Sequence, residues 1–189
     1  ITADIARFGS DKTVIGVWDG FRVKMYAFHG LSVTESAEKI KFFKERNGVK
    51  LSNIIADEDG VGGGVVDILK CKGFVNNSAP LVVSTTRANV VGYQVKAENY
   101  VNLKSQCYFR LAERINKGGV YVECDEMLKQ TIIEELEQVK QHNMDKDTKK
   151  AVVPKDKVKE VLGRSPDFSD TLMMREWFDL SPQLVAWAE

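Results

Sequence analysis

Apolar residues follow two different periods along the chain, and together these periods predict an α/β domain. Near the amino terminus, β-rich apolar runs are separated by polar turns such as GSDK and Asp19-Gly20, and the Asp-Gly pair is typical of a hairpin. Farther along, segments with helical spacing alternate with short apolar runs. We expect strands at residues 1–7, 13–18, 22–28, 51–57 and 81–85, and helices at 32–46, 62–72, 97–117, 125–141 and from Pro166.

The order of these elements predicts a mixed sheet. Three strands joined by short turns favour antiparallel pairing, whereas the later strand–helix units favour parallel pairing with helices on both faces. The polar segment 143–160 includes a short β-like run at 149–154 and is expected to form a solvated hairpin or loop. No repeat or Pro-rich linker divides the chain, so residues 1–189 are expected to form one domain.

Composition excludes several classes of protein. The 43% share of hydrophobic residues argues against disorder, and the 27 basic and 27 acidic residues leave no global basic field, so any DNA-binding surface is local. Cys71, Cys107 and Cys124 form no C-x-x-C pair and His29 and His142 are the only histidines, which argues against zinc and for unpaired thiols in a reducing compartment. No apolar run or signal peptide indicates a membrane, and we expect a soluble intracellular protein.

The stretch ADEDGVGGGVVDIL, residues 56–69, combines acidic residues with four glycines. No Lys-Ser or Lys-Thr follows Gly64, as a phosphate-binding Walker A loop requires, and Val65 stands where a dinucleotide fingerprint needs Gly or Ala. Ile68 replaces the final Glu of a calcium loop. What remains is Asp57 at the carboxyl end of a strand, followed by glycines that allow a sharp turn into a helix, where open α/β sheets collect their ligand sites.

A second carboxylate has a similar position. Asp4 lies between the apolar residues Ala3 and Ile5, where a carboxylate is costly unless it is paired or binds a metal. The alternative is a residue on the solvated edge of a strand. Asp11, in the following GSDKT stretch, is interpreted mainly as a turn residue.

The third acidic element begins the last expected helix. Ser165 is a good N-cap and Pro166 suits the first helical position, so Asp167 falls in the first turn and Asp170 shares its face. Asp167 has an alternative role as a charge that favours the helix start. Asp170 is harder to explain in that way, because most of the following helix is apolar.

Three acidic elements from distant parts of the chain are expected to converge on one point. Clustered carboxylates repel one another unless a divalent cation lies among them, and oxygen ligands favour Mg²⁺ or Mn²⁺. Two such ions about 3.5–4 Å apart support in-line displacement at phosphorus. The pattern therefore indicates phosphodiester hydrolysis.

Four segments, in this order, resemble the carboxyl-terminal nuclease domain of tailed-phage terminase large subunits. They are ITADIARFGSDKTVIGVW, IIADEDGVGGGVVDIL, NLKSQCYFRLAERINKG and VPKDKVKEVLGRSPDFSDTLMM. The resemblance implies an RNase H-like fold of the resolvase/integrase type and a metal-dependent endonuclease, with two Mg²⁺ or Mn²⁺ ions, that cuts concatemeric viral DNA during packaging. The chain starts at Ile1 within an expected strand, and we expect a fragment that lacks the family's amino-terminal ATPase domain.

The resemblance also implies roles for individual residues. Asp4, Asp57, Asp167 and Asp170 match the catalytic, metal-binding positions, although it leaves open which of Asp167 and Asp170 binds metal directly. Asp59 is an accessory candidate.

In such domains the region of segment 143–160 forms a hairpin near the active site and contacts DNA. Lys155 and Arg164 are the preferred phosphate-binding residues because they lie nearest the acidic helix, and Lys149 and Lys150 are further candidates. The alternative is a solvated flap, since acidic residues are interleaved. The remaining lysines of this segment are Lys146, Lys157 and Lys159.

The resemblance further implies partners and location. The partners are duplex DNA, the chain's own ATPase domain, the portal protein and a small terminase subunit, without any membrane. The location is the cytoplasm of the bacterial host, transiently at the prohead portal. The alternatives are a Holliday-junction resolvase-like nuclease and a non-catalytic RNase H-like module that binds DNA or protein.

Overall fold

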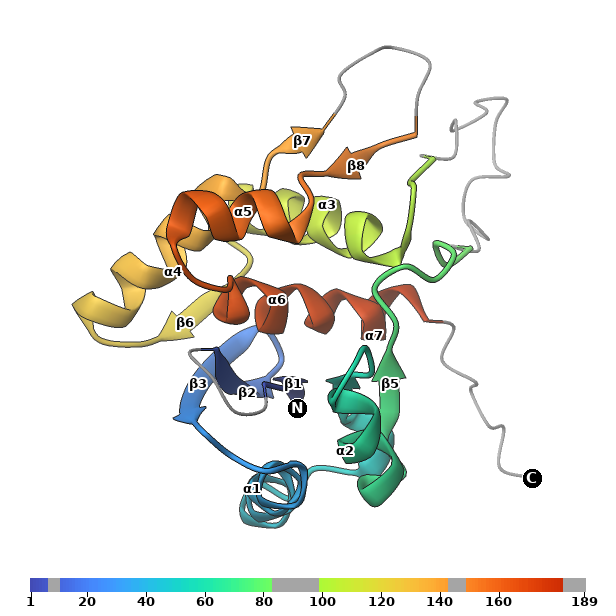
Figure 1. The fold of residues 1–189 in the computed structure, drawn as a ribbon, viewed down its shortest axis with the longest axis vertical. Coiled ribbons are helices and arrows are strands. Elements are labelled where there is room, and N and C mark those ends of the chain that lie inside the picture. Colours follow the sequence, from blue (N-terminus) through green and yellow to red (C-terminus); the bar gives the residue numbers. More distant parts are fainter. Residues whose placement is uncertain (7–10, 83–98, 143–148, 182–189) are drawn as a thin grey trace.

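The computed structural model describes residues 1–6, 11–82, 99–142 and 149–181. Within these ranges it contains a six-stranded sheet in the order β5-β4-β1-β2-β3-β6, a two-stranded hairpin β7-β8, and helices on both sides of the main sheet (Figure 1). The strands are β1 (Thr2–Asp4), β2 (Lys12–Asp19), β3 (Arg22–His29), β4 (Ile55–Asp57), β5 (Lys72–Phe74), β6 (Tyr121–Glu123), β7 (Gln141–His142) and β8 (Ala151–Val152). The helices are α1 (Val33–Arg46), α2 (Gly62–Leu69), α3 (Leu103–Asn116), α4 (Glu126–Gln138), α5 (Lys155–Leu162), α6 (Asp167–Met173) and α7 (Trp177–Leu180), with 3-10 turns at Leu51–Asn53 and Met174–Glu176.

The predicted mixed sheet is confirmed. β1, β2 and β3 pair in antiparallel fashion, with Asp19-Gly20 at the β2–β3 turn and Gly20 at a positive φ of 59°. β4 then pairs parallel with β1, so that Ala3 lies opposite Ala56. Because the next residues are Asp4 and Asp57, both carboxylates stand at the same edge of the sheet.

Two strands differ from the prediction. β5, which continues the parallel order beyond β4, lies at the end of the expected helix 62–72, since α2 stops at Leu69 and Lys70 adopts a left-handed φ of 55°. β6, which pairs parallel with β3, was not predicted at all. Of the strand expected at 81–85, Leu81 and Val82 lie outside the strands, and residues 83–85 are beyond the described ranges.

The helices also differ at their ends. α3 begins at Leu103, after the capping residue Asn102, although the prediction started the helix at residue 97. α4 ends at Gln138, and the residues expected to finish it enter β7. α5 is an additional helix within the segment expected to be a hairpin or loop, whereas the hairpin itself exists as β7 and β8.

Side chains on the two faces of the sheet form two separate cores. Ile15 and Ala56 pack toward α1 and α2, whereas their neighbours Val14 and Ile55 pack toward α3 and α6. This alternation is the period of two that strands impose, and it explains why β1 and β4 are apolar throughout their centres. In the described part of the chain, no helix is long and apolar enough to cross a membrane.

Helix α6 is buried along its whole length and lies against β1 and β2 (Figure 1). Thr171 in its middle donates a hydrogen bond to the carbonyl oxygen of Val14 on β2 at 3.3 Å. The predicted N-cap, Ser165, is wrong: the helix starts at Asp167, and Pro166 precedes it without any side-chain cap. This docking places both aspartates of the helix beside the carboxyl end of β1.

Candidate active site

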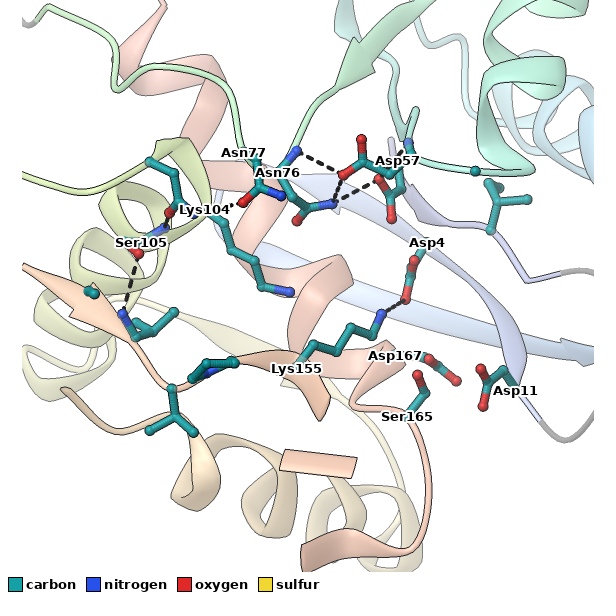
Figure 2. Close-up of a pocket in the computed structure, with 18 of the residues that line it drawn as sticks. Asp4, Asp11, Asp57, Asn76, Asn77, Lys104, Ser105, Lys155, Ser165 and Asp167 are labelled. Carbon is teal, nitrogen blue, oxygen red and sulfur yellow. Dashed lines mark hydrogen bonds and ion pairs between the residues drawn. The ribbon is translucent and has the colours of Figure 1, made fainter. Parts of the chain in front are cut away.

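Four carboxylates from three elements surround one cavity of about 970 Å³ (Figure 2). Asp4 comes from the end of β1, Asp57 and Asp59 from the end of β4 and its turn, and Asp167 from the start of α6. Asp11, interpreted from the sequence mainly as a turn residue, also lines this cavity. Asp4, Asp57 and Asp167, one from each of the three acidic elements, therefore meet at one cavity as expected, whereas Asp170 is not among the residues that line it.

The glycines after Asp57 are required by the backbone. Gly60 has a positive φ of 65°, and a Cβ at Gly62 would lie only 1.8 Å from the carbonyl oxygen of Asp57. The tight turn lets the Asp59 backbone N–H donate to Asp57 Oδ1 at 3.1 Å. The stretch thus orients a carboxylate.

Asn76, which follows β5, holds the same carboxylates from the other side. Its side-chain amide donates to Asp57 Oδ1 at 3.0 Å and to Asp59 Oδ2 at 2.8 Å, and its backbone N–H donates to Asp59 Oδ2 at 3.1 Å (Figure 2). Asp57 therefore has a fixed orientation toward the cavity, and Asp59 supports it through Asn76.

Burial makes three of the carboxylates, Asp4, Asp57 and Asp167, resist ionisation. Asp4 is 4% exposed, and burial raises its pKa well above the usual range, with the charges of Asp170 and Asp167 adding to the rise and Lys155 opposing it. Burial also raises the pKa of Asp57 and of Asp167, although the Lys12 backbone N–H donates to Asp167 at 2.9 Å. A bound cation would offset the free-energy cost of ionising these buried carboxylates.

Asp170 has the opposite environment. Burial alone would raise its pKa, but the ammonium groups of Lys104 at 2.7 Å and Lys155 at 2.9 Å outweigh burial and lower it. The hydroxyl of Tyr108 also donates to Asp170 Oδ1 at 2.7 Å. Asp170 is therefore an ionised carboxylate with both oxygens bonded.

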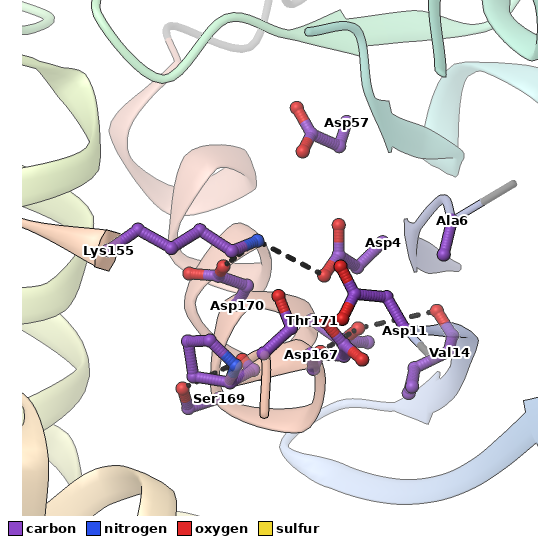
Figure 3. A network of polar contacts seen from close by, with 12 residues as sticks. Asp4, Ala6, Asp11, Val14, Asp57, Lys155, Asp167, Ser169, Asp170 and Thr171 are labelled. Atoms are coloured by element: carbon purple, nitrogen blue, oxygen red, sulfur yellow. Dashed lines mark hydrogen bonds and ion pairs between the residues drawn. The ribbon is translucent and has the colours of Figure 1, made fainter. Parts of the chain in front are cut away.

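Lys155, the first residue of α5, reaches between two of the carboxylates. Its Nζ lies 2.9 Å from Asp170 Oδ2 and 3.9 Å from Asp4 Oδ2 (Figure 3). Burial would lower the pKa of Lys155, but Asp4 and Asp170 outweigh it and raise that pKa. The ammonium of Lys155 therefore lies where these two carboxylates stabilise a positive charge.

The donor set suits a hard divalent cation. Mg²⁺ and Mn²⁺ prefer carboxylate oxygens, and Asp4, Asp57 and Asp167 supply them at one cavity from three rigid elements. Among the described residues, no three His, Cys, Asp or Glu side chains are gathered closely enough in this conformation to hold one ion. Lys155 at Asp4 and Asp170 provides the compensating charge instead.

No protein-family model matches the sequence, and no curated protein matches it. Several solved structures do match this chain. The nuclease domain of the large terminase subunit gp2 of bacterial virus Sf6, a mutant with manganese and beta-thujaplicinol, has a TM-score of 0.75 at 18% identity, over 92% of this chain and 85% of that chain. A mutant of the same domain with calcium has a TM-score of 0.74 at 18% identity, over 92% and 86%.

The large terminase nuclease of thermophilic phage G20c has a TM-score of 0.57 at 18% identity, over 93% of this chain and 78% of that chain. This chain has the fold of a phage large-terminase nuclease domain. The RNase H-like fold expected from the sequence is thereby confirmed. At this identity the similarity establishes the fold of the terminase nuclease domain, and the chemistry depends on the residues described above.

The other predicted DNA-binding residues occupy varied positions on this terminase nuclease fold. Arg164 pairs with the buried Glu135 of α4 and lies 3.5 Å from Glu134, which gives it a structural role. Lys150 lies over the rings of Tyr100 and Phe109, at 6.0 and 5.2 Å from their centroids. Of the remaining lysines, Lys149 and Lys157 are exposed, Lys159 pairs with Asp11 at 3.0 Å, and Lys146 lies outside the described residues.

Three residues of the candidate site were missed by sequence reasoning. They are Asn76, Lys104 and Tyr108, which contact Asp57, Asp59 or Asp170. Asn76 follows β5, a strand that was not predicted and of which only Lys72 falls in the expected helix 62–72, and this hid its position at a strand end. Lys104 and Tyr108 lie on one face of an ordinary amphipathic helix, where the sequence does not distinguish a site residue from a core or surface residue.

Proposed function

We propose that this chain, residues 1–189, forms the nuclease domain of a phage or prophage terminase large subunit. On this proposal it is a metal-dependent endonuclease that hydrolyses phosphodiester bonds of concatemeric viral DNA during packaging. The main support is the convergence of Asp4, Asp57 and Asp167 on one cavity of a fold shared with terminase nuclease domains.

The carboxylates have distinct roles in this proposal. Asp4, Asp57 and Asp167 hold Mg²⁺ or Mn²⁺, because they line the cavity and their charge is incompletely compensated. Asp170 contributes an oxygen only if Lys155 gives up its contact with Oδ2. Two such ions, if held by these residues, would activate a water and stabilise the leaving oxygen.

The protein residues orient and balance these groups. Asn76 and the Asp59 backbone fix Asp57, and the Lys12 backbone fixes Asp167, so the oxygens are aligned before DNA binds. Lys155 keeps a positive charge beside Asp4. Duplex DNA is the substrate, and the portal protein, small terminase subunit and ATPase domain are the proposed partners, in the cytoplasm of the bacterial host.

The first test is nicking and linearisation of supercoiled plasmid with Mn²⁺, Mg²⁺, Ca²⁺ or EDTA. We expect cleavage with Mn²⁺ or Mg²⁺, none with EDTA, and none by Asp57→Asn. Asp67→Asn, which changes an exposed aspartate of α2, is the matched control and should cleave at the parent rate. Cleavage by Asp57→Asn at the parent rate would falsify the assignment of the site.

A further inference from the structure

Lys104, on the first turn of α3, is a cation of the cavity that the proposed chemistry does not use. We propose that Lys104 binds a backbone phosphate of the DNA substrate beside the carboxylates, and that Asp170 and Tyr108 position its ammonium for this contact. The proposal rests on the proposed function, because it assigns a DNA contact to the same cavity.

The backbone around Lys104 is tied to the cavity wall. The Lys104 N–H donates to the Asn76 carbonyl oxygen at 3.2 Å, and the Leu103 N–H donates to the Ser78 carbonyl oxygen at 2.9 Å. Asn102 caps the helix by accepting the Ser105 N–H at 2.9 Å. The start of α3 is therefore fixed against the loop that orients Asp57.

The side chain is also held in place. Its Nζ lies 2.7 Å from Asp170 Oδ1 and 5.6 Å from the centroid of the Tyr108 ring, and Tyr108 donates to the same oxygen. An ammonium has three donors, so the bond to Asp170 leaves donors for a phosphate oxygen. Since the side chain is only 15% exposed and lines the cavity, that oxygen would approach from the cavity.

The wall around Lys104 differs from the acidic side of the cavity. Asn77 and Ser105 lie on the same side of the cavity as Lys104 (Figure 2). With Asn102, which also lines the cavity, they offer neutral polar groups of the kinds that contact DNA phosphates, whereas Asp4, Asp57 and Asp167 repel phosphates. Among the described lining residues, the lysines are Lys104 and Lys155, and Lys155 lies between Asp170 and Asp4, at 2.9 and 3.9 Å from their Oδ2 atoms. Lys104 is therefore the cation that faces a strand lying along the polar wall.

The test measures duplex binding at several salt concentrations with Ca²⁺, by fluorescence anisotropy, for the parent, Lys104→Gln and Lys104→Arg. The logarithm of the binding constant falls with the logarithm of the salt concentration, and each lysine–phosphate contact adds about 0.9 to the magnitude of this slope. We expect Lys104→Gln to lower the slope by about that amount and Lys104→Arg to keep it. Lys41→Gln, which removes a lysine with a 42% exposed side chain from α1 on the opposite face of the sheet, is the control and should keep the parent slope.

The outcomes separate the two proposals. A Lys104→Gln variant that is folded by circular dichroism and keeps the parent slope and affinity would overturn the phosphate contact and leave Lys104 as a counter-charge for Asp170. A parent that binds no duplex would overturn this proposal and the proposed function together. A slope lowered equally by Lys41→Gln would also overturn the assignment to Lys104.

Discussion

Asp167 and Asp170 lie three residues apart on one short helix, yet they meet opposite environments. Burial raises the pKa of Asp167, whereas Lys104 and Lys155 lower that of Asp170 against the effect of burial. The sequence SPDFSD predicts that both face the same side, but it does not reveal which lysines reach them. The choice of metal ligand therefore depends on tertiary contacts.

Substitution of each aspartate in turn by asparagine should separate these roles. We expect Asp167→Asn to weaken Mn²⁺ binding at least about tenfold, since loss of one charged oxygen ligand removes more than about 1.4 kcal/mol. Asp170→Asn should instead cost up to about 3 kcal/mol of unfolding free energy, the low end for a broken buried pair, because Lys155 is 34% exposed. Calorimetric Mn²⁺ titration and urea unfolding without metal would show the difference, and identical behaviour of both variants would contradict it.

The raised pKa of Asp4 predicts a pH dependence of stability. Above its ordinary value of 3.8 the unfolded chain releases a proton that the folded chain retains, so metal-free stability falls as pH rises from there. Asp4→Asn removes this loss of stability. The variant should have a higher melting temperature than the parent, and the difference should grow from pH 4 to 7. Each 1 kcal/mol corresponds to about 2–4 °C at this size.

Thermal melting in EDTA across this range measures the effect. Asp170, whose pKa is lowered, changes charge below its ordinary 3.8 and does not interfere. A melting difference that stays constant with pH would show that Asp4 is ionised in the metal-free fold.

Among the elements, those with strong local signals were predicted and those without were not. The Asp19-Gly20 hairpin and α1, with its Ser32–Glu35 capping box, follow from turn chemistry and helical period. β5 and β6 have three residues each, which is too short for a period to be visible. α5 buries Val158 alone, so its polar sequence indicated a loop.

The turn between β4 and α2 should tolerate no side chain at Gly62. Gly62→Ala places a Cβ 1.8 Å from the Asp57 carbonyl oxygen and should cost about 1–3 kcal/mol of stability, as overpacking does, while shifting Asp57. Gly63→Ala is the matched control, because its Cβ would lie 3.2 Å from the Glu58 carbonyl oxygen. Chemical unfolding and Mn²⁺ titration would test both variants, and equal losses would refute the argument.

The junction of α4 with α6 depends on Arg164. Its partner Glu135 is fully buried and also accepts the Ser169 N–H at 2.8 Å, so Arg164→Ala leaves a buried carboxylate and should cost about 3–5 kcal/mol. Arg22→Ala breaks an exposed pair with Glu123 and should cost much less, because solvent screens the charges of an exposed pair. Urea unfolding compares them.

A second change would distinguish structure from DNA binding at this position. Glu135→Gln in the Arg164→Ala background should recover part of the stability, because no unpaired charge remains. If Arg164→Ala were as stable as the parent but bound DNA more weakly, the DNA contact expected from the sequence would be supported instead.

At the scale of the molecule, the site exists because the fold brings together three segments that lie far apart in the sequence. β1 and β4 present Asp4 and Asp57 at one edge, and α6, more than 100 residues later, docks over β1 and β2. The convergence was predictable, since carboxyl ends of adjacent parallel strands share an edge. The partners Asn76 and Lys104 were not, because their positions depend on how β5 and α3 meet that edge.

The place of Lys155 has a thermodynamic consequence for metal loading. The chain supplies its own counter-ion at Asp4 and Asp170, so on the proposed function entry of a divalent ion there would exchange one cation for another. The free energy of metal binding would then be the difference between two attractions, and a titration would report that difference instead of the intrinsic affinity of the carboxylate oxygens. Lys155 is the first residue of α5, which follows the β7–β8 hairpin, so any shift of its ammonium on metal binding would be felt at that hairpin.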